Sequence, residues 1–323
     1  MKLLRRQFLH LAAGAVALPA VSRIAKAQTY PTRPVRIIVG FPPGITPDIV
    51  ARLIAQSLSE RLGQQFIVDN RTGAGTNIAA ELVVRAAPDG YSLLVVTGTN
   101  TVNATLYEGL NFDIVRDIAP IVAYYRGPSV LVVNPSVPAK TLPEFIAYAK
   151  ANPGKINYAS DGNGTTTHVF CELFKVMADV DLVHVPYRGS YLPDLLSGQV
   201  QAAFSTPATT IAYIRAGQLR VLAVTSATRS DALPEIPSIG EFVPGYEANT
   251  WNGIGAPKST PAEIISKLNT EINAVVADPQ IKERFAKLGG TAIGGSPAEF
   301  GKLITSEIEK WGRVIRAANI KVE

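Results

Sequence analysis

The chain has 323 residues, which is enough for two domains or one large domain with an ample core. Its 31 Lys and Arg exceed its 26 Asp and Glu, but five of the basic residues and none of the acids lie in the first 27 positions. The remaining chain is formally neutral and has no run of Lys and Arg interleaved with aromatic residues, so we expect no nucleic-acid partner. The single cysteine, Cys171, excludes an internal disulfide, and we expect it to be a small buried residue.

Residues 1–27 have the pattern of a signal peptide. A charged start precedes an apolar stretch from Phe8 to about Val21, and the segment ends in the small-x-small sequence Ala25-Lys26-Ala27. The pair Arg5-Arg6 followed by Gln-Phe-Leu favours the twin-arginine route, with general secretion as the alternative. The apolar stretch is interrupted by proline and is too short for a good membrane span. We therefore expect an exported protein that is cleaved after Ala27.

From residue 35 onward, short β-rich runs alternate with longer helical patterns, which is typical of an α/β protein with largely parallel sheets. The predicted strands cover residues 35–41, 65–70, 92–97, 119–124, 130–133, 156–160, 182–187, 200–205 and 220–225. The first helix is predicted over residues 48–62, because its apolar residues share one face and Gly63 follows. Three helices are predicted toward the C-terminus, over residues 261–278, 279–288 and 297–317, with Thr260 and Ser296 as caps.

The number of strands and helices favours two sheets, and hence two lobes, over a single sheet. The strands at 119–124 and 130–133 are too close for a helix between them, so we expect the chain to cross there to the second lobe. A return is expected after Val224, through the proline-rich residues 233–237 to residues 252–257. The predicted division is a signal peptide at 1–27, a discontinuous first lobe at 28–127 and 247–323, and a second lobe at 128–246.

Ligands of open α/β sheets bind beyond the carboxyl ends of the strands, so the strand-to-helix junctions are the first places to look for a site. After the first strand, Thr46 is a candidate cap, Pro47 fits the first helical position and Asp48 is the first-turn acid. The N–H groups of such a helix start can bind a carboxylate or a phosphate. The alternative is a junction that only turns the chain.

Three further junctions are polar. Residues 160–168 combine two glycines with short hydroxyl side chains, which suits an anion cradle or simply a capped loop, but they lack the Lys and the third glycine of nucleotide motifs. In residues 187–190, Arg188 is either a bidentate partner for a carboxylate or a solvated surface charge. Residues 97–101 and the junction at Ser205 offer hydroxyls and amides, which suit recognition of a polar small molecule.

Catalytic and cofactor motifs are absent from the sequence. It contains no G-x-S-x-G elbow, no H-E-x-x-H, no cysteine pair and no phosphate loop, so we expect no catalytic residue, no metal and no cofactor. His184 alternates with valines in a predicted strand and is expected to be packed there. His168, beside the glycine loop, is the only plausible general base, and no activated nucleophile accompanies it.

Several motifs, in order and over nearly the whole chain after residue 27, resemble one known family. They are YPTRPVRIIVGFPPG, NRTGAGTNIAAE, APDGYSLLV, NPGKINYAS with GNGTTTH, HVPYRG with DLLSGQV, LRVLAVTSATRS, LPEIPSIGE and PGYE. Together they resemble the Bug-type extracytoplasmic receptors of tripartite tricarboxylate transporters. The resemblance implies a type II periplasmic binding protein, in which two Rossmann-like α/β lobes close on a small carboxylate in the cleft between them.

The resemblance also implies partners and site residues. The bound organic acid would be delivered to two integral membrane permease subunits, and the receptor is expected to act as a monomer in the periplasm. Ligand contacts are expected from the loop after the first strand and from loops of the second lobe, partly through backbone N–H groups and waters. On this chain the ligand-binding residues are then Phe41, Gly44, Thr46, Asp48, Thr97, Ser160, Gly162, Asn163, Thr165, Tyr187, Gly189 and Ser205.

The chain departs from the family pattern at two places, and two other functions stay open. Ile45 replaces a common glycine, and the segment between Tyr187 and Asp194 is shorter than the common form, so both changes add bulk near the expected ligand. The first alternative function is an exported hydrolase or isomerase that uses His168. The second is a ligand-presenting partner of a membrane sensor, which the sequence does not distinguish from a transport receptor.

Overall fold

The computed structural model describes residues 30–230, 233–317 and 319–321 of the chain. The predicted signal peptide, residues 1–27, lies outside the described residues. The chain divides into two compact units, residues 1–32 and residues 33–323, and the fold below is that of the second unit. Within the described ranges, no helix has both the length and the apolar composition needed to cross a lipid bilayer.

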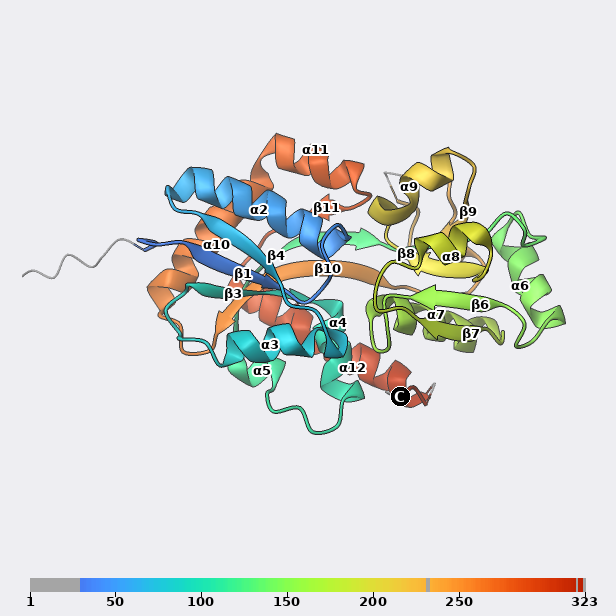
Figure 1. The fold of residues 1–323 in the computed structure, drawn as a ribbon, viewed down its shortest axis with the longest axis horizontal. Helices are drawn as coiled ribbons and strands as arrows, with labels where there is room; N and C mark the ends of the chain where they lie inside the picture. Colours follow the sequence, from blue (N-terminus) through green and yellow to red (C-terminus); the bar gives the residue numbers. More distant parts are fainter. Residues whose placement is uncertain (1–29, 231–232, 318, 322–323) are drawn as a thin grey trace, which may run out of the picture. The chain divides into compact units, whose positions relative to one another are not determined.

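Two separate β-sheets form the framework of this unit (Figure 1). The first sheet has the order β11-β4-β10-β3-β1-β2 and contains β1 (Val35–Val39), β2 (Phe66–Asn70), β3 (Ser92–Thr97), β4 (Ile118–Pro128), β10 (Asn249–Pro257) and β11 (Thr291–Ala292). The second sheet has the order β7-β6-β8-β5-β9 and contains β5 (Val130–Val133), β6 (Asn157–Ser160), β7 (Val183–Pro186), β8 (Ala202–Ser205) and β9 (Arg220–Val224). We call each sheet with its helices a lobe. The prediction of two sheets is confirmed, and every predicted strand is present with small shifts at its ends.

The pairing within the sheets is mixed, which corrects the expectation of largely parallel sheets. β1 pairs in parallel with β2 and β3, and β6 pairs in parallel with β7 and β8. The pairings that involve β4, β5, β10 or β11 are antiparallel. β10 was not predicted from the sequence, because Gly253 and Gly255 interrupt the β-branched pattern that marks most strands. A Cβ atom on Gly253 would lie 2.2 Å from Phe300, so glycine is required where the C-terminal helix packs on this strand.

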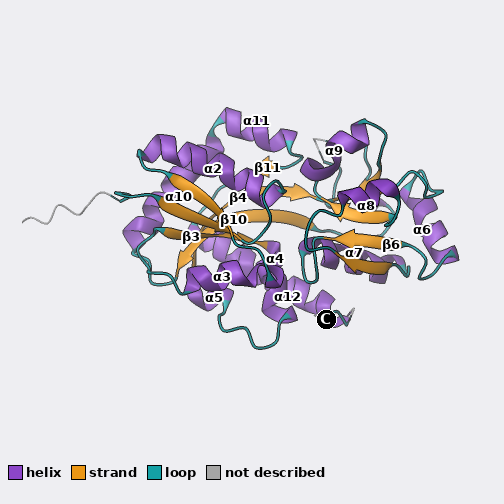
Figure 2. Ribbon diagram, viewed as in Figure 1, coloured by secondary structure: helices purple, strands orange, loops and turns teal. Residues whose placement is uncertain are grey.

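Helices cover both faces of each sheet (Figure 2). In the first lobe, one face carries α2 (Thr46–Leu62), α10 (Ala262–Ala277) and α11 (Pro279–Lys287), and the other carries α3 (Asn77–Val84), α4 (Gly98–Leu106), α5 (Ile114–Asp117) and α12 (Pro297–Ala317). In the second lobe, α6 (Leu142–Ala151) and α7 (Thr166–Ala178) lie opposite α8 (Leu192–Ser197) and α9 (Pro207–Arg215). Two short 3-10 helices, η1 (Ala74–Thr76) and η2 (Ile239–Glu241), lie in the connections. Because both faces are covered, central strands such as β5 are apolar throughout.

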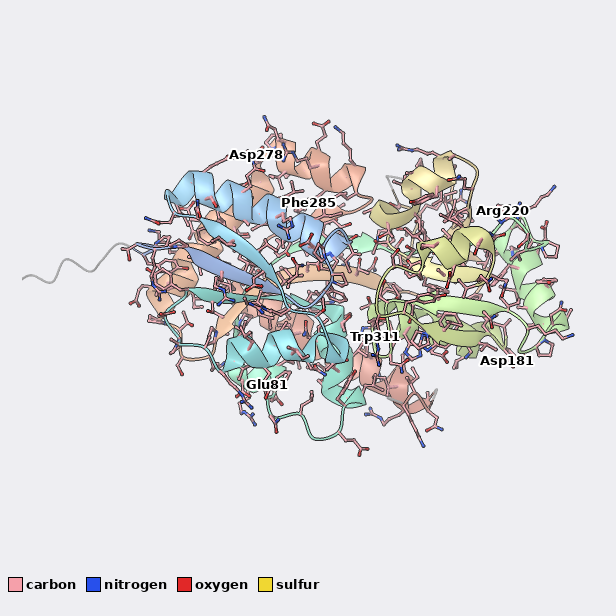
Figure 3. The ribbon with its side chains drawn as sticks, viewed as in Figure 1. Glu81, Asp181, Arg220, Asp278, Phe285 and Trp311 are labelled. Carbon is pink, nitrogen blue, oxygen red and sulfur yellow. The ribbon has the colours of Figure 1, made fainter. Side chains whose placement is uncertain are left out.

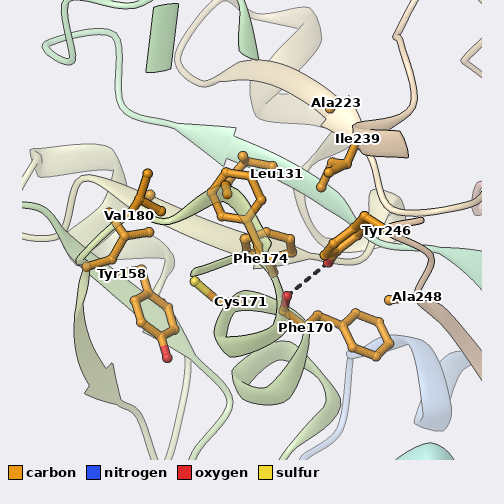
Figure 4. Close-up of a cluster of buried hydrophobic side chains, with 14 of the residues drawn as sticks. Leu131, Tyr158, Phe170, Cys171, Phe174, Val180, Ala223, Ile239, Tyr246 and Ala248 are labelled. Atoms are coloured by element: carbon orange, nitrogen blue, oxygen red, sulfur yellow. Dashed lines mark hydrogen bonds between the residues drawn. The ribbon is translucent and has the colours of Figure 1, made fainter. Parts of the chain in front are cut away.

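The largest buried cluster joins the second sheet to helices of both lobes (Figure 4). Phe170 on α7 stacks on Trp311 of α12, which Figure 3 labels, with ring centroids 5.1 Å apart. The Tyr246 hydroxyl donates a hydrogen bond to the carbonyl of Phe170 at 2.9 Å. Cys171 is buried in the same cluster with a free thiol, as its sequence context predicted. The two lobes therefore share apolar packing along α7 and α12.

The two chain crossings between the lobes run side by side. β4 ends at Pro128 in the first sheet and β5 begins in the second, which confirms the predicted crossing. Next to it, the Ser129 N–H donates to the Thr225 hydroxyl at 2.8 Å, and the Thr225 N–H donates to the Ser129 carbonyl at 2.9 Å. The returning segment is tied to the same residue, because the Ala248 N–H donates to the Thr225 carbonyl at 2.8 Å. The lobe boundaries at 127/128 and 246/247 stay a prediction.

The start of α2 differs from the sequence prediction. Ile45 rather than Thr46 is the N-cap residue, and no side chain caps the helix, so Thr46 and Pro47 occupy its first positions. The Thr46 hydroxyl donates instead to the hydroxyl of Thr206 in the second lobe at 2.8 Å. Thr46, a residue type that often caps helices, therefore contacts the other lobe instead.

Of the two N-cap residues predicted for helices near the C-terminus of the chain, one caps its helix and the other does not. Ser296 acts as predicted, because its hydroxyl accepts a hydrogen bond from the Glu299 N–H at 3.2 Å. Thr260 does not cap α10: Pro261 is the N-cap residue, and the buried Thr260 hydroxyl has no hydrogen-bond partner within the described residues.

Asp48 anchors the loop that leads into α2. Its buried carboxylate accepts hydrogen bonds from the Gly44 N–H and the Asn70 amide, both at 2.9 Å, and pairs with Arg52 at 2.9 Å. Asn70 also donates to the carbonyl of Phe41 at 2.9 Å. Burial alone would raise the pKa of Asp48, but the hydrogen bonds from Arg52, Gly44 and Asn70 outweigh it and hold the pKa below the ordinary value of 3.8.

We expect Asp48→Asn to lower the free energy of unfolding by about 1–3 kcal/mol at neutral pH, because a neutral amide replaces a charged acceptor of several hydrogen bonds. A depressed pKa in the folded state means that the carboxylate stabilises the fold above its unfolded pKa and loses this effect as the pH falls through the folded value. Denaturant unfolding of both proteins across this range should therefore show a difference that narrows below about pH 4. A pH-independent difference would contradict the account, and Asp179→Asn, at a side chain that is 97% exposed, is the control.

Candidate functional site

A cavity lies between the two lobes. From the first lobe it is lined by Phe41, Ile45, Thr46, Pro47, Thr97, Gly98, Thr99, Thr250, Trp251 and Asn252. From the second lobe it is lined by Asp161, Thr166, Thr167, Tyr191, Thr206 and Thr209. Every lining segment adjoins the end of a strand or the start of a helix, except the part that β10 contributes.

Four helices of nine or more residues begin at this cavity, and Tyr191 in the lining is the N-cap residue of the shorter α8. Ile45, Thr46 and Pro47 are the cap and first residues of α2, and residues 97–99 hold the same positions in α4. Thr166 and Thr167 begin α7, and Thr206 is the N-cap residue of α9. In Figure 1 the four helices begin near the middle of the view, where the two lobes meet.

The electrostatic character of the cavity follows from these helix starts. The first-turn N–H groups of a helix have no partners within the helix, and the aligned peptide dipoles place partial positive charge at this end. The lining contains no Lys, Arg or His, so the backbone supplies the positive potential. An arrangement of this kind can hold a carboxylate or another small anion by hydrogen bonds from the main chain.

Two hydrogen bonds join the lobes across the cavity. The hydroxyl of Thr46 donates to that of Thr206 at 2.8 Å, which links the starts of α2 and α9. The Thr166 N–H donates to the Thr99 hydroxyl at 3.4 Å, which links the starts of α7 and α4. Each bond connects helices from different lobes, so the cavity is bounded on both sides by facing helix ends.

The part of the wall that β10 contributes includes an aromatic ring and an amide. The Trp251 ring packs edge-on against Phe300 at a centroid distance of 5.7 Å, and its N–H donates to Glu307 at 3.3 Å. Asn252 is 2% exposed, and its side-chain oxygen has no hydrogen-bond partner among the described residues. An unpaired buried amide oxygen at the cavity can accept a hydrogen bond from a donor group of a ligand.

Some of the residues predicted from the sequence lie at this cavity. Phe41, Thr46 and Thr97 line it directly. Ser205 is fully buried one residue before Thr206, and its hydroxyl accepts a hydrogen bond at 2.6 Å from Tyr191, which lines the cavity.

The other predicted residues do not line this cavity but hold the surrounding loops. Gly44 and Asp48 bond to each other at the start of α2. The Tyr187 hydroxyl donates to Asp194 at 2.6 Å, and a Cβ atom added at Gly189 would meet no other group within 4 Å. The set that lies outside the lining is therefore Gly44, Asp48, Ser160, Gly162, Asn163, Thr165, Tyr187, Gly189 and the adjacent Ser205.

The loop between β6 and α7 is fixed by its own hydroxyl groups. The Ser160 hydroxyl accepts from the Gly162 N–H at 3.1 Å and contacts Nε2 of His184 at 2.6 Å. The Thr165 hydroxyl donates to the Gly162 carbonyl at 2.8 Å. Gly162 has a φ of +118°, which favours glycine at this position. These bonds set the path of the loop and so place Asp161 at the cavity.

His168, the only candidate base in the sequence, lies away from this cavity. Its Nδ1 accepts a hydrogen bond from the Gly164 N–H at 3.2 Å, and its ring stacks on His184 at a centroid distance of 3.9 Å. Burial, and then the charge of Lys175, lower the pKa of His168 to about 4. Burial, and then His168, lower the pKa of His184 to about 3. His168, His184 and Asn163 line a second cavity.

Sequence reasoning missed several lining residues. Asp161 and Thr206 lie in two of the strand-to-helix junctions that were predicted to form the site, but no local sequence signal distinguishes them from their neighbours. Trp251 and Asn252 belong to β10, which was not predicted as a strand. The register of β10 against β3 places Asn252 opposite Thr97, so a correct strand pairing would have found it.

Comparison with known proteins identifies the family of this fold and cavity. The family model described as tripartite tricarboxylate transporter family receptor matches residues 50–320. A solved structure from R. palustris, described as being with adipate, is 38% identical with a TM-score of 0.87, and the match covers 90% of this chain and 99% of that one. The periplasmic binding protein BugD is 30% identical with a TM-score of 0.85, covering 91% and 100% of the two chains. MatC from Rhodopseudomonas palustris with bound malate is 29% identical with a TM-score of 0.83, covering 88% and 100%.

The family model extends over both lobes and includes the cavity-lining residues from Thr97 onward. The matched proteins are solute-binding receptors, in agreement with the resemblance that the sequence motifs indicated. The chain therefore belongs to the receptor family of the tripartite tricarboxylate transporters.

Proposed function

We propose that the protein is a periplasmic receptor that binds one small carboxylate in the cavity between its lobes and delivers it to two membrane permease subunits. It acts as a monomer and catalyses no reaction. The observation that carries this proposal is that the N-termini of four helices of nine or more residues line one cavity, and that this lining has no Lys, Arg or His.

The chemistry of this cavity supports a carboxylate as ligand. Main-chain N–H groups at helix starts donate hydrogen bonds to anions, and hydroxyl groups such as those of Thr46 and Thr206 can donate as well. The structural neighbours described with adipate and with bound malate hold ligands of this class. Because the ligand would contact both lobes, its binding favours the arrangement in which the lobes are together.

The N-terminal residues support export. Residues 1–27 have the charged start, apolar stretch and small-x-small end of a signal peptide, and Arg5-Arg6 favours the twin-arginine route. We propose that the mature receptor begins after Ala27. The description of BugD as a periplasmic binding protein agrees with this location.

The position of His168 weighs against the alternative of an exported hydrolase or isomerase. A general base must reach the proton that it removes, and His168 does not line the cavity. Its lowered pKa of about 4 also makes it a weak base near neutral pH. The lining hydroxyls therefore have no imidazole partner to activate them as nucleophiles.

Titration calorimetry against mono-, di- and tricarboxylates should give saturable binding of one ligand per chain. Because helix starts rather than exposed basic side chains hold the anion, we expect the affinity to fall by less than about threefold between about 0.05 and about 0.3 M salt. The matched amides, which carry no charge, serve as negative controls. A steep salt dependence that Arg188→Ala abolishes would contradict the proposal, because it would move the anion to an exposed cation.

Replacement of His168 by Ala should leave the affinity for the bound carboxylate within a few fold of wild type. The reason is that the imidazole supports the β6–α7 loop from behind and lies outside the cavity. Thermal unfolding should show a lower Tm for the variant, because a buried side chain is lost. NMR would detect conversion of a panel compound. If the wild type converts any of them and His168→Ala does not, the protein is an enzyme instead.

A further inference from the structure

Asp161 is the only side chain with a formal charge at neutral pH among the residues that line the ligand cavity. We propose that Asp161 is a specificity-determining residue, which selects a monocarboxylate whose other polar group donates a hydrogen bond and selects against a second carboxylate. The donor would be an amide, hydroxyl or ammonium group. This inference rests on the proposed function, since it describes the ligand of the same cavity.

The surroundings of Asp161 hold its carboxylate at the cavity without neutralising it. The residue follows β6 directly, and its N–H donates to the hydroxyl of Thr167 at 3.0 Å. That hydroxyl approaches Oδ2 of Asp161 at 3.4 Å, a long hydrogen bond. Among the described ion pairs, none involves Asp161, and no cation contributes to its titration. The carboxylate therefore keeps acceptor capacity that a ligand can use.

The pKa of Asp161 agrees with the absence of a cationic partner. Burial raises the pKa of Asp161 to about 6, against the hydrogen bond from Thr167, which lowers it. Tyr191 is the other titratable side chain in the lining, and burial and then the charge of Asp161 raise its pKa further above neutral. Behind the loop, His168 and His184 have pKa values of about 4 and 3. Asp161 is thus the group at this cavity that changes charge close to neutral pH.

The position of Asp161 also distinguishes the start of α7 from the starts of α2, α4 and α9. Because its carboxylate lies beside Thr167 in the first turn of α7, it already occupies part of the positive end of that helix. The starts of α2, α4 and α9 then remain for the carboxylate of the ligand. A second carboxylate near Asp161 would meet a like charge, and the two groups would have to share a proton. A donor group at the same place forms a charge-assisted hydrogen bond instead.

Four ligands of equal chain length test this selection: adipate, its half-amide, 6-aminohexanoate and hexanoate. We expect titration calorimetry at about pH 8 to give at least about tenfold tighter binding of the half-amide or the amino acid than of adipate. As the pH falls through about 6, Asp161 takes up a proton and becomes a donor, so adipate should gain affinity relative to the half-amide. We also expect the complex to take up protons when adipate binds. Calorimetric titrations in buffers of different ionisation enthalpy measure this uptake.

The isosteric variant Asp161→Asn separates this effect from ionisation of the ligands themselves. It should strengthen adipate binding at about pH 8 and remove most of the preference for the half-amide, since the amide can donate to a carboxylate. Asp179→Asn, at the exposed C-terminal end of the same helix, should behave as wild type. Thermal unfolding of each variant establishes that it is folded, and the wild-type pH series tests the inference without any variant.

Two results would overturn the inference while leaving the proposed function in place. They are tighter binding of adipate than of the half-amide by the wild type at about pH 8, and an unchanged preference in Asp161→Asn. Absence of binding for all four ligands and for the wider carboxylate panel would instead contradict the proposed function, and the inference would fail with it.

Discussion

The parallel pairing of β1 with β3, and of β6 with β8, is the constraint on which the ligand cavity depends. Parallel strands end at the same edge of a sheet, so the helices that follow them begin at that edge. These are α2 and α4 in the first lobe and α7 and α9 in the second. Residues from all four helix starts line one cavity. Its positive potential therefore arises from the topology, without a Lys or Arg in the lining.

The connections between the lobes suit a cavity that must admit and release its ligand. The two crossings are tied together by hydrogen bonds among Ser129, Thr225 and Ala248, and the lobes also pack against each other along α7 and α12. Across the cavity, the lobes are joined by neutral hydrogen bonds such as that between Thr46 and Thr206. A neutral hydrogen bond contributes about 0.5–1.5 kcal/mol, so a ligand that contacts both lobes can shift the equilibrium between open and closed arrangements.

The sequence predicted the location of the site better than its contacts. Strand-to-helix junctions are local signals, so the regions of the four helix starts could be found from hydroxyl, glycine and proline patterns. Asp48 has the same local signature as a ligand residue, but its carboxylate is used by the loop itself. Trp251 and Asn252 depend on the pairing of β10, which is non-local. Asp161 stands in a predicted loop, and only the three-dimensional path of that loop places it at the cavity.

A crystal structure of the mature protein with a bound carboxylate is the most direct test of the central claim, that helix starts rather than basic side chains hold the ligand. The account predicts carboxylate oxygens within about 2.7–3.2 Å of main-chain N–H groups in the first turns of at least two of the four helices, with no Lys or Arg nitrogen in contact. A carboxylate bound in an ion pair with Arg188, or outside the cavity between the lobes, would contradict it.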